Sequence, residues 1–408
     1  MATDVKAPLR PGVLLLGPAF VAAIAYVDPG NVAANVSAGA QFGFLLVWVI
    51  LVANVMAGLV QYLSAKLGLV TGRTLPESVA DHTRTPTRIA YWLQAELVAM
   101  ATDLAEVVGG AIALYLLLDL PLLVGGVITG AVSLVLLAVQ NRRGQQMFER
   151  VITGLLLVIA VGFLTSLVVE PPSAADVASG LLPRFDGAES ILLATAMLGA
   201  TVMPHAVYLH SGLARDRHGQ PEAGALRRRM LRITRYDVAL AMLVAGAVNL
   251  AMLLVAATNL QGVENTDSIE GAYAAVQSSL GHTVALCFAI GLLASGLAST
   301  SVGAYAGAMI MQGLLRRTYP LLLRRLVTLV PALVILAIGV DPSRALVLSQ
   351  VVLSFGIPFA LIPLVRLTSR RELMGADVNH RVTTLLGWLV AAVISVLNVV
   401  LIYLTVTG

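Results

Sequence analysis

Apolar stretches long enough to cross a lipid bilayer as a helix, which takes roughly 20 residues, recur along the whole chain. Hydrophobic residues account for 58% of the 408 positions and charged residues for only 12%, about half the charged fraction of a soluble domain. The mean hydropathy is +0.89. The sequence therefore predicts an all-α polytopic membrane protein, with no segment left over for a soluble domain.

The hydropathy pattern predicts eleven spans, which places the two termini on opposite sides of the membrane. The spans lie at roughly 12–38, 41–66, 89–118, 121–139, 148–169, 188–212, 231–258, 282–313, 321–339, 344–365 and 383–406. If the N-terminus is cytoplasmic, all of the 26 Lys and Arg except Arg184 and Arg344 fall in cytoplasmic segments or at cytoplasmic span ends. We therefore expect a cytoplasmic N-terminus and an extracytoplasmic C-terminus. The net charge of +4 then reflects topology, and nucleic acid is not an expected partner.

The single cysteine, Cys287, lies inside an expected span. A disulfide framework and a cysteine-based metal cluster are therefore both excluded.

An Asp-Pro-Gly-Asn sequence at 28–31 interrupts the first apolar stretch. An ionised Asp28 at mid-membrane is costly, and Pro-Gly beside it breaks the helical hydrogen bonding, so this position should have a compensating function. The alternative is a surface turn between two short helices. However, the stretch from Val13 to Val27 is too short to span a bilayer by itself, which predicts a break at mid-membrane, buried in protein or lining a wet cavity.

A Met-Pro-His sequence at 203–205 interrupts the sixth apolar stretch, which runs in the opposite direction to the first. Two broken helices in corresponding halves are typical of transporters built from inverted repeats, with the substrate site at the breaks. Division near residue 175 gives a first repeat at 1–175, a second at 176–367 and an appended eleventh span at 368–408, all within one membrane domain.

The groups at these two breaks are cation ligands. Asp28 offers a carboxylate, Asn31 an amide oxygen and Met203 a thioether, and the broken helix end frees a carbonyl, which we assign to Ala200. Hard Mg²⁺ and Ca²⁺ gain little from a thioether, whereas first-row transition ions accept both oxygen and sulfur. The set favours Mn²⁺ or Fe²⁺. Ordinary helix packing remains the alternative role for Met203.

Three acids, Glu96, Asp103 and Glu106, share one face of the third span at spacings of seven and three. Carboxylates in a membrane can be neutralised and recharged, so such a stripe indicates an ion or proton path. Structural pairing with Arg residues is the alternative, and both roles are compatible.

His205 and His210 lie on the inner half of the sixth span and titrate near neutral pH, which suits proton handling beside a charged site. Hydrogen-bonded packing is the alternative for both. Gln61 and Asn249 are polar residues within spans, where they either line a hydrated vestibule or bond neighbouring helices.

The two interrupting motifs resemble the paired signatures of the Nramp family of proton-coupled divalent metal transporters. The resemblance extends to Ala-Thr-Asp-Leu-Ala-Glu at 101–106 in the third span, and to 349–351 (Ser-Gln-Val) and 358–360 (Pro-Phe-Ala) in the tenth. It covers nearly the whole chain. One departure is Ala206, where many relatives have Asn, but that residue is not a metal ligand in the family.

The resemblance implies a leucine-transporter-type fold, with two inverted five-helix repeats plus an eleventh helix and with the first and sixth helices broken. The implied metal ligands are Asp28, Asn31, the Ala200 carbonyl, Met203 and, as the site occludes, Gln350. Arg217, Arg324 and Arg325 resemble the basic members of the family's salt-bridge network, along which protons would leave toward the cytoplasm.

The expected function is import of Mn²⁺, Fe²⁺ and similar ions with protons by alternating access, in a bacterial inner membrane. The metal is then substrate and not cofactor, and no obligate protein partner is implied. A sodium-coupled carrier of amino acids or other organic solutes on the same fold and a passive divalent cation channel are the alternatives. An intramembrane metalloenzyme is not expected, because the sequence contains neither a His-Glu-x-x-His nor a Gly-x-Ser-x-Gly pattern.

Overall fold

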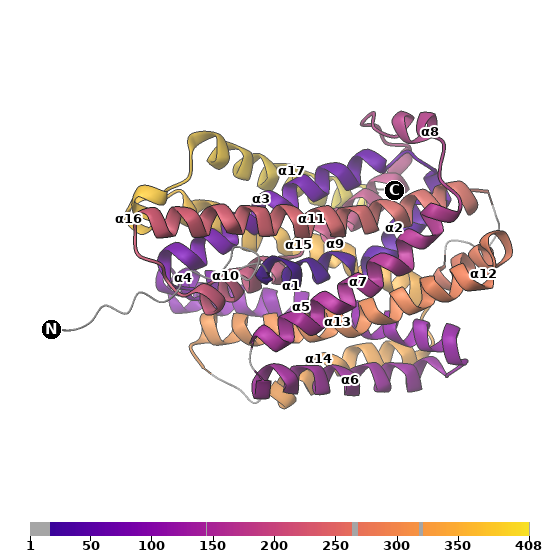
Figure 1. Ribbon diagram of the computed structural model, residues 1–408, viewed down its shortest axis with the longest axis horizontal. Helices are drawn as coiled ribbons and strands as arrows, with labels where there is room; N and C mark the ends of the chain where they lie inside the picture. The colour runs from indigo at the N-terminus through magenta and orange to yellow at the C-terminus, as the bar shows by residue number, and fades with distance from the viewer. Residues whose placement is uncertain (1–16, 144, 263–267, 318–320, 408) are drawn as a thin grey trace.

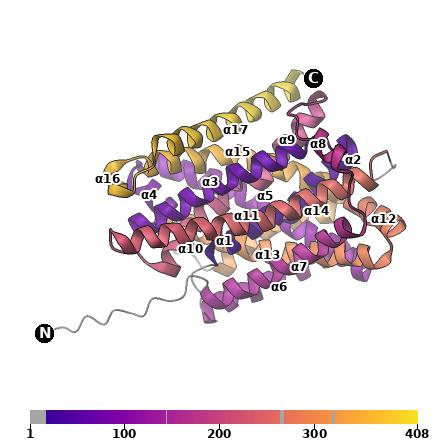
Figure 2. The ribbon, with the colours of Figure 1, turned by 45° about the horizontal axis from the view of Figure 1, so that its top comes forward.

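The computed structural model describes residues 17–143, 145–262, 268–317 and 321–407, and every regular element within these ranges is helical (Figures 1 and 2). The long helices are α3 (Val47–Thr71), α5 (Thr85–Leu118), α6 (Leu122–Arg143), α7 (Gln145–Val169), α11 (Ala225–Asn259), α13 (His282–Leu315), α14 (Leu321–Ile338), α15 (Pro342–Thr368) and α17 (Arg381–Thr407). The interrupted helices are α1 (Pro18–Ile24), η2 (Ala25–Val27) and α2 (Pro29–Phe42), and α9 (Gly187–Thr201) with α10 (Pro204–His218). The short connecting elements are α4 (Leu75–Asp81), α8 (Ala174–Ser179), α12 (Ile269–Leu280), α16 (Arg371–Met374) and η3 (Gly375–Asp377).

Each predicted span coincides with a long helix or with an interrupted pair, except that residues 12–16 of the first lie outside the described ranges. Over the described residues, 8 helices are long and apolar enough to cross a membrane, counting α9 and α10 together. The other expected spans correspond to α1 with α2, to α6, and to α14, which carries two arginines near its start. Large apolar side chains such as Val55, Leu243 and Leu385 are 74%, 67% and 69% exposed on the outside of the bundle. The protein is therefore an integral membrane protein of helices, as predicted.

The interrupted helices occupy the middle of the bundle. Every residue from Pro29 to Ala40 in α2 and from Pro204 to Ala214 in α10 is buried. In both views α17 lies at one edge of the bundle and α6 at the opposite edge, with α1 between them (Figures 1 and 2). The chain runs from α1 to α2 toward the end marked by α8 and α12, and returns from α9 to α10 toward the end marked by α4 and α16. The two interrupted helices are thus antiparallel.

The predicted interruptions are confirmed, and each includes the first residue of its motif. Asp28 is extended (φ −69°, ψ 167°) and caps α2, so Pro29 begins a helix and is not part of a loop. Met203 is likewise extended (φ −63°, ψ 123°) and precedes α10, which begins at Pro204. Proline at the first helical position sacrifices no hydrogen bond, because that N–H has no intrahelical partner. The α-helical hydrogen bonding is therefore interrupted at residues 25–28, of which 25–27 form a 3-10 helix, and at 202–203.

Helices α3 and α10 cross at close range. The Ser64 hydroxyl of α3 donates to the Val207 carbonyl of α10 at 2.5 Å. At Gly68 the backbones approach so closely that an added Cβ would overlap the Ser211 carbonyl of α10. Small residues at such crossings are how membrane helices pack without a hydrophobic driving force between them.

Gly68→Val should lower the melting temperature of the purified protein in detergent by several degrees, because overpacking a close crossing costs on the order of 1–3 kcal/mol. Thermal unfolding followed by size-exclusion fluorescence measures this. Gly154→Val is the matched control, since a Cβ at this exposed glycine of α7 has no neighbour within 4 Å. Equal melting temperatures for the two variants would contradict the close crossing.

Candidate metal centre

The two breaks meet through the side chain of Asn31. Its Nδ2 donates to Asp28 Oδ1 at 2.8 Å and to the Ala200 carbonyl at 2.9 Å, although Asn31 and Ala200 are 169 residues apart. The Ala200 carbonyl lacks a helical donor because the residue four positions on is Pro204, which has no N–H. The end of α9 is thereby fixed against the start of α2.

Surrounding helices satisfy other carbonyls that the first break exposes. Asn249 Nδ2 of α11 donates to the Tyr26 carbonyl at 2.7 Å, and the Ser295 hydroxyl of α13 donates to the Val27 carbonyl at 2.6 Å. Asn249 also accepts from Asn35 Nδ2 at 3.0 Å. Of the two roles considered for Asn249, interhelical bonding is therefore the one the structure shows.

Three side-chain oxygens at the junction are buried and accept no hydrogen bond from the described part of the chain. They are Asp28 Oδ2, Asn31 Oδ1 and Gln350 Oε1. Gln350 comes from α15 and lies against α2, since a Cβ added at Gly30 would overlap its amide. Buried acceptors without a donor cost free energy, and a bound cation would recover it.

Met203 is fully buried at the second break, directly before α10. No cluster of three or more His, Cys, Asp or Glu positioned to hold a metal occurs among the residues that the structure describes. A metal held here would depend on carboxylate, amide, carbonyl and thioether donors together. That mixture of hard and soft donors suits transition ions better than Ca²⁺ or Mg²⁺.

The acids of α5 face α14. Glu96 Oε1 lies 3.2 Å from Arg324 Nη2, and Asp103 pairs with Arg325, whose Nε also donates to Ser133 Oγ at 3.2 Å. Glu96 and Asp103 thus form the structural ion pairs with arginine that were one of their two expected roles. Glu106 differs, because its Oε2 is buried without a hydrogen-bond partner in the described chain.

Both histidines of α10 are hydrogen-bonded through Nδ1. His205 Nδ1 lies 3.3 Å from Thr102 Oγ1 of α5, and His210 Nδ1 lies 2.6 Å from Gln61 Oε1 of α3. Gln61 in turn donates to the Tyr26 hydroxyl beside the first break. The Nε2 atoms of both rings are buried and have no partner within the described ranges. Each ring therefore takes part in helix packing through Nδ1 and keeps Nε2 without a hydrogen bond.

Arg217 belongs to a separate cluster at the α4 end of the bundle. Its Nε lies 3.5 Å from Glu149 Oε2 of α7. Nearby, Asp237 of α11 accepts from the backbone N–H groups of Gly17 and Ala19 at 3.0 Å each and so holds the start of α1. Glu149 and Asp237 were not among the site residues expected from the sequence. Both are acids inside or beside apolar stretches, and that signal, which identified the α5 acids, would have found them.

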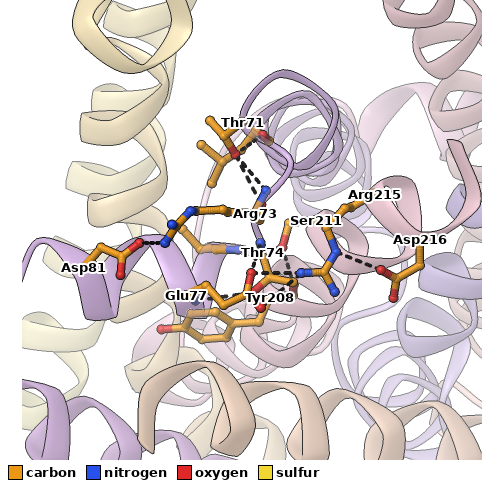
Figure 3. Close-up of polar contacts among 11 residues, drawn as sticks. Thr71, Arg73, Thr74, Glu77, Asp81, Tyr208, Ser211, Arg215 and Asp216 are labelled. Atoms are coloured by element: carbon orange, nitrogen blue, oxygen red, sulfur yellow. Dashed lines mark hydrogen bonds and ion pairs between the residues drawn. The ribbon is translucent and has the colours of Figure 1, made fainter. Parts of the chain in front are cut away.

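A second polar cluster ties the end of α10 to α4 (Figure 3). Thr74 and Glu77 form a capping box at the start of α4, and Arg215 Nη1 of α10 pairs with Glu77 Oε2 at 2.8 Å. Ser211 Oγ accepts from the Leu75 N–H at 2.8 Å. These contacts connect the half of the second interrupted helix that lies beyond Met203 to the α3–α4 connection.

The sequence matches the family described as "Natural resistance-associated macrophage protein-like", Nramp, over residues 19–404. This chain belongs to the Nramp family. It is 68% identical to the divalent metal cation transporter MntH of Mycobacterium tuberculosis over 408 residues, which is 100% of this chain and 95% of that relative. It is 48% identical to the MntH of Deinococcus radiodurans over 94% of this chain and 88% of the relative.

Solved structures agree with the fold. A manganese transporter from Eremococcus coleocola superposes with a TM-score of 0.86 at 30% identity, covering 97% of this Nramp chain and 88% of that chain. Mhp1, a nucleobase-cation-symport-1 family transporter, superposes with a TM-score of 0.61 at 16% identity over 95% and 90% of the two chains. At that identity the likeness concerns the fold alone. The predicted leucine-transporter-type fold is confirmed.

Proposed function

We propose that this protein imports divalent transition metal ions such as Mn²⁺ and Fe²⁺ together with protons, by alternating access. The observation that carries the proposal is the set of buried oxygens without donors on Asp28, Asn31 and Gln350, gathered where two interrupted helices meet. The names of the relatives, divalent metal cation transporters and a manganese transporter, agree with this substrate class.

In the proposed site the metal is bound by Asp28, Asn31, the Ala200 carbonyl, Met203 and Gln350. Asp28 Oδ1 is held by the Asn31 amide and backbone N–H groups, each at 2.8 Å, which leaves Oδ2 for the metal. The Ala200 carbonyl accepts one hydrogen bond and keeps a second lone pair. Met203 supplies the soft donor that discriminates against Ca²⁺ and Mg²⁺.

Protons enter the mechanism because a metal requires the anion of Asp28, so metal binding releases any proton it holds. Helix α5 packs directly on the first break, since a Cβ at Gly109 would overlap Pro29. Glu106 lies one turn before Gly109 on the same face of α5. Further along the same helix, Asp103 and Glu96 form ion pairs with arginines of α14. We infer a proton route along Glu106, Asp103, Glu96, Arg325 and Arg324, with His205, His210 and Arg217 as further members.

Alternating access requires α1 and α10 to part from their neighbours at the α4 end. The contacts that hold this end are those of Asp237 with α1, Arg217 with Glu149, and Arg215 with Glu77. We assign this end to the cytoplasm on the Lys and Arg distribution, with the C-terminus outside, in a bacterial inner membrane. The chain is proposed to consist of inverted repeats at 1–175 and 176–367 with 368–408 appended, and the bundle around the two interrupted helices rocks to open the site.

Asp28→Asn should abolish saturable Mn²⁺ uptake into proteoliposomes, because the only charged ligand of the proposed site is lost while the shape is kept. Asp176→Asn, at an exposed acid of α8, is the control and should transport normally. Uptake of the Asp28 variant equal to that of the control would discard the site.

Met203→Ala should keep measurable Mn²⁺ transport but weaken discrimination against Ca²⁺ severalfold, because the remaining donors are all oxygen. Competition of Ca²⁺ with Mn²⁺ uptake measures this. Met252→Ala removes a similarly buried Met from α11 and should leave the competition unchanged. If Ca²⁺ competes equally in both variants, Met203 is a packing residue.

An inward proton gradient should drive Mn²⁺ accumulation above its external concentration, which a passive channel cannot do. Glu106→Gln should reduce this uphill accumulation while preserving part of the downhill flux, because the variant cannot exchange a proton at this position. Glu170→Gln, at an exposed acid after α7, should behave as wild type. Absence of uphill transport by the wild type would contradict coupling, and undiminished accumulation by Glu106→Gln would exclude this residue from the route.

A further inference from the structure

A small cavity of about 120 Å³ opens between α4, the start of α5 and the end of α15, away from the proposed metal site. Its polar lining residues are His82, Thr83, Tyr91, Arg366 and Arg370. Figures 1 and 2 both place α4 and α16, which follows Arg370, at the same end of the bundle. No Asp or Glu lines this cavity.

Arg366 and Arg370 lack the carboxylate partners that Arg73, Arg227 and Arg316 have. Neither makes an ion pair or a side-chain hydrogen bond within the described part of the chain. The nearby carboxylate of Asp81 is already shared by Arg73 and Arg316, the latter at 2.7 Å. Two uncompensated guanidinium groups beside one cavity therefore favour an anionic occupant, and guanidinium binds phosphate through paired hydrogen bonds.

Other groups around the cavity suit the same occupant. His82 Nδ1 is 2.8 Å from the Ser78 carbonyl, so its Nε2 is free to contact a ligand. Thr83, which lines the cavity, stands two residues before the start of the 34-residue helix α5, whose N-terminal end carries partial positive charge.

An apolar strip continues from the basic residues along the outside of α15. Phe359, Ile362 and Arg366 follow one another at spacings of three and four, so they share one helical face. Phe359 and Ile362 are 45% and 38% exposed, and Ile89 on α5 is 42% exposed. The Tyr91 ring packs edge-on against Phe359 with ring centroids 6.0 Å apart and joins the cavity to this strip. A free phosphate would use the basic end alone, whereas a phospholipid would use both.

We propose that this cavity and strip bind an anionic phospholipid, with its phosphate between Arg366 and Arg370 and its acyl chains along Phe359 and Ile362. The lipid contacts α4, whose Glu77 holds Arg215 of α10. A bound lipid therefore stabilises the end of the bundle that the proposed transport cycle has to open.

The experiment adds dioleoyl phosphatidylglycerol, phosphatidylcholine with the same chains, or inorganic phosphate to the delipidated full-length protein in detergent. Melting temperature and lipid retention in native mass spectrometry are measured. Phosphatidylglycerol should raise the melting temperature and be retained, and the other two should do neither. Arg366→Gln with Arg370→Gln should weaken retention by roughly tenfold or more, because each arginine near an anionic lipid contributes about a fivefold factor.

Arg228→Gln with Arg229→Gln is the matched control, since these exposed residues at the start of α11 carry the same charge and do not line the cavity. It should retain phosphatidylglycerol as wild type does. Should the double Arg366 and Arg370 variant fold poorly, Arg366→Gln alone changes one exposed side chain and should still weaken retention. Equal retention by the Arg366 and control variants would overturn the proposal, as would an equal effect of phosphatidylcholine or of inorganic phosphate on the wild type.

Discussion

The two helix interruptions at the centre of this protein occur at prolines, which have no N–H group. Pro29 and Pro204 stand four residues after Ala25 and Ala200, so the helices cannot continue their hydrogen bonding through these carbonyls. Within a bilayer, a backbone group without a partner costs several kcal/mol, and water is absent to supply one. The interruptions must therefore be enclosed by protein, and the bond from Asn31 to the Ala200 carbonyl is the contact that joins one interruption to the other.

The helices around the interruptions are adapted to this requirement. Asn249 and Ser295 extend from α11 and α13 to satisfy carbonyls of the first break, and Gly109 of α5 allows the backbone to approach Pro29. The surroundings satisfy most of the polar groups but leave oxygens of Asp28 and Asn31 without donors. This selective shortage of donors is the observation on which the proposed cation site rests.

The charged side chains are paired in different ways at different positions along the bundle. Glu96 and Asp103 are matched by two consecutive arginines of α14, and removal of one member of such a buried pair would leave an uncompensated charge in a medium that solvates it poorly. Toward the α4 end the Arg215–Glu77 pair is more exposed, whereas Arg217 and Glu149 are buried to a similar degree as Glu96 and Arg324, and both pairs join α10 to neighbouring segments. Arg366 and Arg370 differ from these arginines in having no carboxylate partner among the described residues, and they face the outside of the bundle beside an apolar strip.

The sequence by itself determined the membrane class, the positions of the spans and the existence of both interruptions, because span length and the missing N–H of proline are local properties. The structure narrows the first interruption to the start of its motif, since Asp28 is extended and Pro29, favourable at the start of a helix, already begins α2. Gln350 was implied only by family resemblance, and its position against Gly30 emerged only with the packing of α15 on α2. The partners of Glu149 and Asp237 were equally hidden. Which distant groups meet depends on how whole helices pack, and no local pattern in the sequence encodes that.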